Sequence, residues 1–125
     1  MSGCFIDTNV ILRYLLDDNE EQALLAEHVI NGGAWTTPEV LAEVTHVLKH
    51  HYCCERREIF TALELTANVV ELRPYAETLE AIREYGETGL DFVDCMASAY
   101  NKCGESVFTF DIELNRRMSE TITGR

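Results

Sequence analysis

Acidic side chains end two apolar stretches of the sequence in the same way. Asp7 follows the apolar residues 5–6, and Asp111 follows residues 108–110. Because the carboxyl ends of parallel strands open on one edge of a sheet, where ligands bind, both carboxylates are expected at that edge. Strand-end acids also cap helices, and this role explains either residue equally well when it is considered alone. The repetition of the pattern favours a shared site.

Three further acids fall within predicted helices or at their ends. Glu43 lies in the second turn of a helix that starts at Pro38, at the border of its apolar stripe, where a solvated acid is the usual interpretation. Asp91 and Asp94 stand three residues apart at the start of another helix. Capping explains Asp91 fully and Asp94 only in part. Asp94 and Glu43 are therefore candidates for a role beyond helix stability.

The elements that must position these acids alternate between short apolar strands and longer amphipathic helices, which indicates an α/β fold with a parallel sheet. Thr36 and Glu39 have the spacing of a capping box around Pro38. Strands are predicted over residues 4–6, 34–36, 69–73 and 106–110. Helices are predicted over residues 10–16, 20–30, 38–51, 55–68, 74–86, 92–103 and 112–118, with residues 120–123 as an edge strand or a tail.

Length and composition predict one globular domain over residues 1–125, with 46% hydrophobic and 26% charged residues. The net charge of −12 argues against a broad basic face for nucleic acid and against docking on an anionic membrane. Neither a transmembrane stretch nor a signal peptide is recognised, so the cytosol is the expected location. The five cysteines form no C-x-x-C pair, and buried reduced thiols are expected rather than disulfides or a zinc knuckle.

Four segments resemble, in order, those of the PIN-domain ribonucleases. They read FIDTNVIL (5–12), TPEVLAEV (37–44), DFVDCMA (91–97) and VFTFD (107–111), and the chain has the length of the VapC-type toxins of that family. The resemblance implies a three-layer domain with a central parallel sheet flanked by helices. It also implies one metal site, and carried over by position its acids are Asp7, Glu43, Asp94 and Asp111. The flanking positions that would support the site are Thr8, Asn9, Thr109 and Asp91.

The family's chemistry suits these residue types. Four carboxylates in one cleft repel one another, and their hard oxygens suit Mg²⁺ or Mn²⁺, which would polarise an RNA phosphodiester for attack by water. The resemblance therefore implies an endoribonuclease that leaves 5′-phosphate and 3′-hydroxyl ends, and a toxin with an antitoxin partner. A homodimer is a further expectation, through residues 10–16 and 38–51. A housekeeping PIN nuclease in RNA processing and a catalytically silent PIN binding module remain alternatives.

Two other interpretations are weaker. Residues 7–10 resemble the D-x-D start of the aspartate-nucleophile phosphatases, but Asn9 replaces the second acid. His46 and His50, with His51 next to them, could hold a transition metal on one helix face, although Val47 breaks the H-E-x-x-H pattern and a solvated polar face is favoured. The bases that could contact phosphate are Arg13, Lys49, Arg56, Arg57, Lys102, Arg116 and Arg117.

Overall fold

The structure, a computed structural model, describes residues 3–123. These residues fall into two compact units, one that ends at Tyr75 and one that begins at Ala76. Each unit has its own set of buried apolar side chains. The prediction of a single domain over residues 1–125 stays a prediction.

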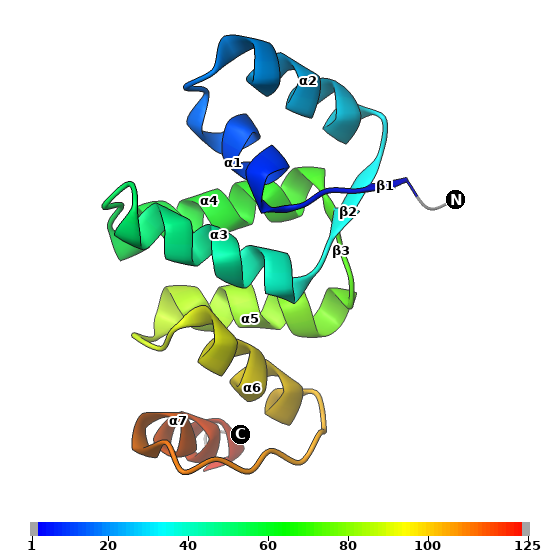
Figure 1. Cartoon of the computed structure of the whole chain (residues 1–125). Helices are drawn as coiled ribbons and strands as arrows, with labels where there is room; N and C mark the ends of the chain where they lie inside the picture. The colour runs from blue at the N-terminus through cyan, green and yellow to red at the C-terminus, as the bar shows by residue number, and fades with distance from the viewer. Residues whose placement is uncertain (1–2, 124–125) are drawn as a thin grey trace. The chain divides into compact units, whose positions relative to one another are not determined.

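The first unit contains a parallel sheet of three short strands in the order β1-β2-β3 (Figure 1). The strands are β1 (Cys4–Phe5), β2 (Ala34–Thr36) and β3 (Glu71–Leu72), and Phe5 pairs with Trp35. The hydrogen bonding continues one residue beyond β1, because the Ile6 amide donates to the Trp35 carbonyl at 3.0 Å. The parallel sheet and the alternation of strands with helices confirm the predicted α/β class.

Four helices accompany this sheet, and they match the predicted ranges to within about two residues. They are α1 (Thr8–Leu16), α2 (Glu20–Asn31), α3 (Pro38–His50) and α4 (Arg56–Val69). In Figure 1, α1 and α2 lie beside one another, as do α3 and α4. The apolar side chains that this unit buries are Ile6, Ile11, Leu12, Ala26, Ile30, Ala34, Leu41, Val44, Leu48, Ile59, Leu63, Val70 and Leu72.

α3 starts at Pro38 as predicted, but its capping differs from the prediction. Thr37, rather than Thr36, is the N-cap residue, and it makes no side-chain capping bond. Thr36 is fully buried, and its hydroxyl donates to the Ile6 carbonyl at 3.1 Å. The predicted capping box is wrong because the Thr36 side chain serves the sheet. A capping box does form at α4, where Glu58 accepts from the backbone amide of Glu55 at 2.8 Å.

The second unit is helical within the described residues. It holds α5 (Tyr75–Glu87), which begins at the boundary, α6 (Phe92–Lys102) and α7 (Ile112–Thr123). Its buried apolar side chains are Ala81, Ile82, Tyr85, Phe92, Cys95, Met96, Ala99, Leu114 and Met118. The prediction of buried thiols holds for Cys95 and is wrong for Cys4, Cys53 and Cys103, which are exposed. The prediction that residues 120–123 form an edge strand or a tail is wrong, because α7 continues through them.

The predicted strand over residues 106–110 is also wrong, since these residues adopt neither strand nor helix. A strand needs a neighbouring backbone to bond with, and no strand lies among the described residues from 76 onward. Phe108 and Phe110 are 82% and 90% exposed, with their rings edge-to-face at 5.1 Å. In the described part of the chain, no helix combines the length and apolarity needed to cross a membrane.

Candidate metal site

Asp7 leaves the sheet at its carboxyl edge. It follows the last residue that bonds to β2 and caps α1, with its Oδ1 accepting from the Val10 amide at 3.3 Å. The side chain is exposed, and Oδ2 has no partner among the described residues. Thr8 and Asn9 form the first turn of α1, and neither side chain bonds to Asp7 in the described structure. One carboxylate oxygen of Asp7 is thus held by the helix while the other is available to a ligand.

Glu43 belongs to the same unit. It is the sixth residue of α3, the helix that starts where β2 ends, and it is exposed beside the buried Val44. About 7.5 Å of helix axis therefore separates it from Pro38. No hydrogen bond or ion pair joins Glu43 to another described residue. The carboxylate is open to a ligand, as it would also be in a solvated surface acid.

Asp91 and Asp94 occupy the start of α6 in the second unit. Asp91 is the N-cap residue, and its Oδ1 accepts from the Asp94 amide at 2.9 Å. This confirms Asp91 as a cap. The carboxylate of Asp94 makes no hydrogen bond or ion pair with the described residues, although it is half-buried. Capping therefore leaves the Asp94 side chain unexplained.

Asp111 precedes α7 and is held on both sides. Its Oδ1 accepts from the Leu114 amide at 2.8 Å, and its own amide donates to the Thr109 hydroxyl at 3.1 Å. The side-chain amide of Asn115 donates to the Thr109 carbonyl at 2.9 Å. Thr109 thus fixes the backbone at Asp111 and leaves the second carboxylate oxygen free.

The electrostatics of the second unit connect three of these acids. Burial raises the pKa of Asp94, and the negative charges of Asp91 and Asp111 raise it further. The negative charge of Asp111 thus acts on Asp94, although 16 residues lie between them in sequence. A bound cation would neutralise these like charges around the half-buried Asp94.

Asp91, Asp94 and Asp111 thus belong to one unit, where the first and third act electrostatically on the second. Asp7 and Glu43 belong to the other unit. Among the described residues, no three histidine, cysteine or acidic side chains already form a cluster able to hold a metal ion. The convergence of all four acids on one ion stays a prediction.

Sequence reasoning missed the most buried acid, Glu84 on α5. Its side chain is fully buried and accepts two hydrogen bonds from Arg117, at 2.9 and 3.0 Å, and one from the Ser98 hydroxyl at 2.9 Å. Lys102 forms an ion pair with it. Burial alone would raise the pKa of Glu84, but the bonds from Arg117, Lys102 and Ser98 outweigh it and hold the pKa below its usual range. The apolar period of α5, with Ala81 and Ile82 before Glu84, was the available signal.

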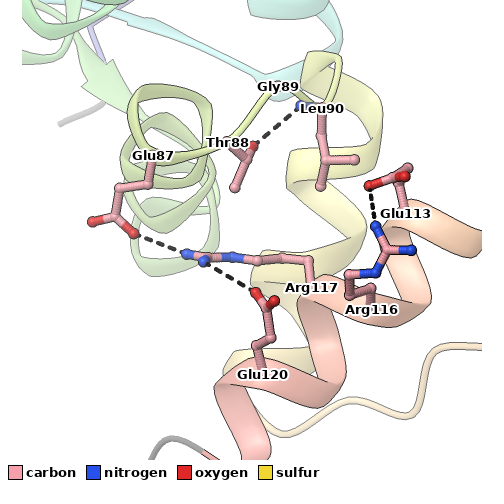
Figure 2. A pocket seen from close by; sticks show the side chains of 8 residues that line it. All are labelled: Glu87, Thr88, Gly89, Leu90, Glu113, Arg116, Arg117 and Glu120. Carbon is pink, nitrogen blue, oxygen red and sulfur yellow. Dashed lines mark hydrogen bonds and ion pairs between the residues drawn. The ribbon is translucent and has the colours of Figure 1, made fainter.

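This cluster changes the interpretation of the bases. Arg117 also donates to Glu87 at 2.8 Å and lies 4.0 Å from Glu120, so it is bound between acids at a pocket of about 410 Å³ (Figure 2). Arg116 pairs with Glu113 at the same pocket. Arg116 and Arg117, both predicted as possible contacts for phosphate, are therefore already paired with acids.

Two of the remaining bases are open. Lys49 and Arg57 are exposed and make no hydrogen bond or ion pair with the described residues. Arg13, by contrast, pairs with Asp18 at 2.6 Å. Lys49 and Arg57 are the clearest candidates for contact with a phosphate chain.

Comparison with known proteins gives a consistent result. The family model described as "PIN domain" matches residues 4–118. A curated relative, "VapC ribonuclease" of Aquifex aeolicus (strain VF5), is 31% identical over 106 residues, which cover 78% of this chain and 77% of the relative. No solved structure matches.

Proposed function

The chain belongs to the PIN-domain family, and from this premise we propose that it is a metal-dependent endoribonuclease, the toxin of a toxin–antitoxin pair. The observation that carries the proposal is the family match over residues 4–118, a span that includes all four candidate acids. The relative named VapC ribonuclease supports the same activity and the toxin role.

The donor set fits a hard divalent cation. Asp7, Glu43, Asp94 and Asp111 offer carboxylate oxygens, the ligands that Mg²⁺ and Mn²⁺ prefer. The raised pKa of Asp94, caused by burial and by its acidic neighbours, also fits a site whose negative charges a bound cation would neutralise. When bound, such an ion neutralises the carboxylates and polarises the scissile phosphodiester.

The protein's own part in this reaction is to orient the carboxylates before RNA arrives. The Val10 amide holds one oxygen of Asp7, and the Leu114 amide holds one oxygen of Asp111. Both acids are thereby restrained by helix starts, whose positive end favours a negative charge. Water then attacks the phosphorus and the 3′ oxygen leaves, which gives the expected 5′-phosphate product.

An antitoxin would meet an acidic and partly apolar surface. On α2, Leu24 is 60% exposed and Leu25 is 61% exposed. Leu24 lines a pocket of about 720 Å³ with the acids Glu20 and Glu27, and Leu25 lines a second, more apolar groove. These features support a partner that presents an apolar helix with basic residues. The homodimer through α1 and α3 is part of the same proposal.

The decisive experiment is cleavage of single-stranded RNA with Mg²⁺ or Mn²⁺ by wild type and by Asp7→Asn. Asparagine keeps an oxygen that accepts from Val10, so the variant should fold normally while cleavage falls by at least about 10²-fold. Unchanged cleavage by folded Asp7→Asn would contradict the site assignment. If wild type binds Mn²⁺ but cleaves no RNA, the silent binding module becomes the better description.

Asp17→Asn is the matched control. It makes the same chemical change at an exposed acid that ends α1 in a left-handed conformation (φ 55°), which asparagine tolerates well. Its activity should equal that of wild type. A common loss in both variants would point to general charge effects rather than to a metal ligand.

A further inference from the structure

His46 and His50 form an exposed pair on α3. They stand one helical turn apart, with ring centroids 4.5 Å from each other and ring planes at 48°. Neither imidazole makes a hydrogen bond or an ion pair with the described residues, and both are exposed. All four ring nitrogens of the pair are therefore available to a ligand from solvent.

The backbone beneath the pair is held in place. Val44 and Leu48, on the opposite side of the helix, are buried at 0% and 3% exposure. The end of α3 is closed by the His51 amide, which donates to the Val47 carbonyl at 2.8 Å. The Cys54 amide donates to the Leu48 carbonyl at 2.9 Å and extends this closure. The two imidazoles thus project from a fixed helical turn rather than from a frayed end.

We propose that His46 and His50 chelate a borderline transition ion such as Ni²⁺, Zn²⁺ or Cu²⁺, with water completing its coordination. Imidazole nitrogen suits these ions far better than Mg²⁺, so the site is chemically distinct from a carboxylate site. Two ligands at positions i and i+4 lie on one helix face and can bind one ion together. Once the first histidine binds, the fixed turn presents the second at high effective concentration.

Charged side chains on α3 both favour and oppose a cation at this site. Glu43 lies three residues before His46, and Glu39 lies four residues before Glu43, so two carboxylates flank the N-terminal side of the pair. Lys49 is the neighbour of His50 and opposes a cation there. Since no three potential ligands cluster among the described residues, the site has two protein ligands.

The test is calorimetric titration of metal-free protein with Ni²⁺, in excess Mg²⁺ so that carboxylates are occupied. Wild type should bind one Ni²⁺, and His46→Ala or His50→Ala should each weaken binding by at least about tenfold. Alanine favours the helix, and circular dichroism checks that the fold is kept. Equal Ni²⁺ affinity in His46→Ala and wild type would overturn the proposal.

Two controls separate the pair from other ligands nearby. His51→Ala removes the adjacent imidazole, whose ring contacts Tyr52 instead, and should leave Ni²⁺ affinity unchanged. A Cys53→Ser/Cys54→Ser variant should also bind as wild type does; loss of binding there would assign the ion to the thiols and overturn the proposal. In NMR spectra, Ni²⁺ should broaden the ring signals of His46 and His50 before those of His28. Equal broadening of all histidines would likewise contradict a chelate.

Discussion

Arg117 donates two parallel hydrogen bonds to the carboxylate of Glu84, from Nε at 2.9 Å and from Nη2 at 3.0 Å. The bond connects α7 to α5, and Lys102 on α6 pairs with the same carboxylate. All three helices of the second unit therefore meet at one buried acid. Asp94 lies on α6 and Asp111 directly precedes α7. Because the ion cluster joins these helices, it also fixes the position of Asp94 relative to Asp111, and both are candidate metal ligands.

The first prediction concerns the stability of this cluster. Glu84→Gln leaves the positive charges of Arg117 and Lys102 without their shared partner, so the free energy of unfolding should fall by about 3 kcal/mol. Urea denaturation of the metal-free protein measures the change.

Glu113→Gln provides the control. It breaks an ion pair with Arg116 in which both side chains are more than half exposed, and it should cost no more than about 1 kcal/mol. If the two substitutions cost the same, the Glu84 cluster does not hold the helices together.

The second prediction follows from the raised pKa of Asp94, which burial and the charges of Asp91 and Asp111 cause. A carboxyl whose folded pKa lies above its unfolded value favours folding only while it is protonated. Its contribution to the free energy of unfolding is fully present below the unfolded pKa and is lost as pH rises through the folded pKa. Asp94→Asn should therefore raise the melting temperature at pH 7 in EDTA and leave it unchanged near pH 3.

Mn²⁺ should reverse this ranking if Asp94 is a ligand. The cation stabilises wild type at pH 7 by binding the folded state, and the Asn variant loses most of that gain. Scanning calorimetry with and without Mn²⁺ measures both effects. A destabilised Asp94→Asn variant in EDTA would contradict the repulsion on which the prediction depends.

Local signals explain how much of the fold could be predicted. Helix starts at Pro38 and Phe92 were predicted at the residues where they occur, because prolines and capping acids act within one turn of the chain. Segment 106–110 has an equally strong local pattern and forms no strand. A strand depends on a partner backbone, which no local pattern supplies.

The candidate site was likewise predictable only in its local features. The sequence predicts the capping roles of Asp91 and Asp111, because each acid accepts a hydrogen bond from a helix-start amide only three residues away. The bond between Glu84 and Arg117 spans 33 residues and was not foreseen. The relative positions of the acids also depend on contacts between residues far apart in the sequence. Residue types therefore identify candidate ligands but do not predict where their side chains lie.

The third prediction concerns RNA binding by the inactive Asp7→Asn protein. Because Lys49 and Arg57 are the exposed bases left unpaired in the described structure, the log–log dependence of affinity on salt should be shallower than about −4. Arg57→Gln should reduce the slope by about 0.7, the value for one contact with a single strand. Fluorescence anisotropy over a salt series measures it.

Arg83→Gln is the matched control for Arg57. Arg83 is also exposed but is paired with Glu80 at 3.2 Å, so its removal should leave the slope unchanged. A slope steeper than −4 in the starting protein would show that bases now paired in the structure open to bind RNA.

The last prediction tests how Asp111 is positioned. Thr109→Val keeps the shape of the side chain but removes the hydroxyl that accepts from the Asp111 amide, whereas Thr109→Ser keeps that hydroxyl. If Asp111 is a metal ligand, the valine variant should need roughly 10-fold more Mn²⁺ for half-maximal RNA cleavage, and the serine variant should resemble wild type. At saturating Mn²⁺ the valine variant should recover most of its maximal rate, because the ligand itself is still present. A lower maximal rate with an unchanged Mn²⁺ requirement would instead place Thr109 in contact with RNA and remove its positioning role.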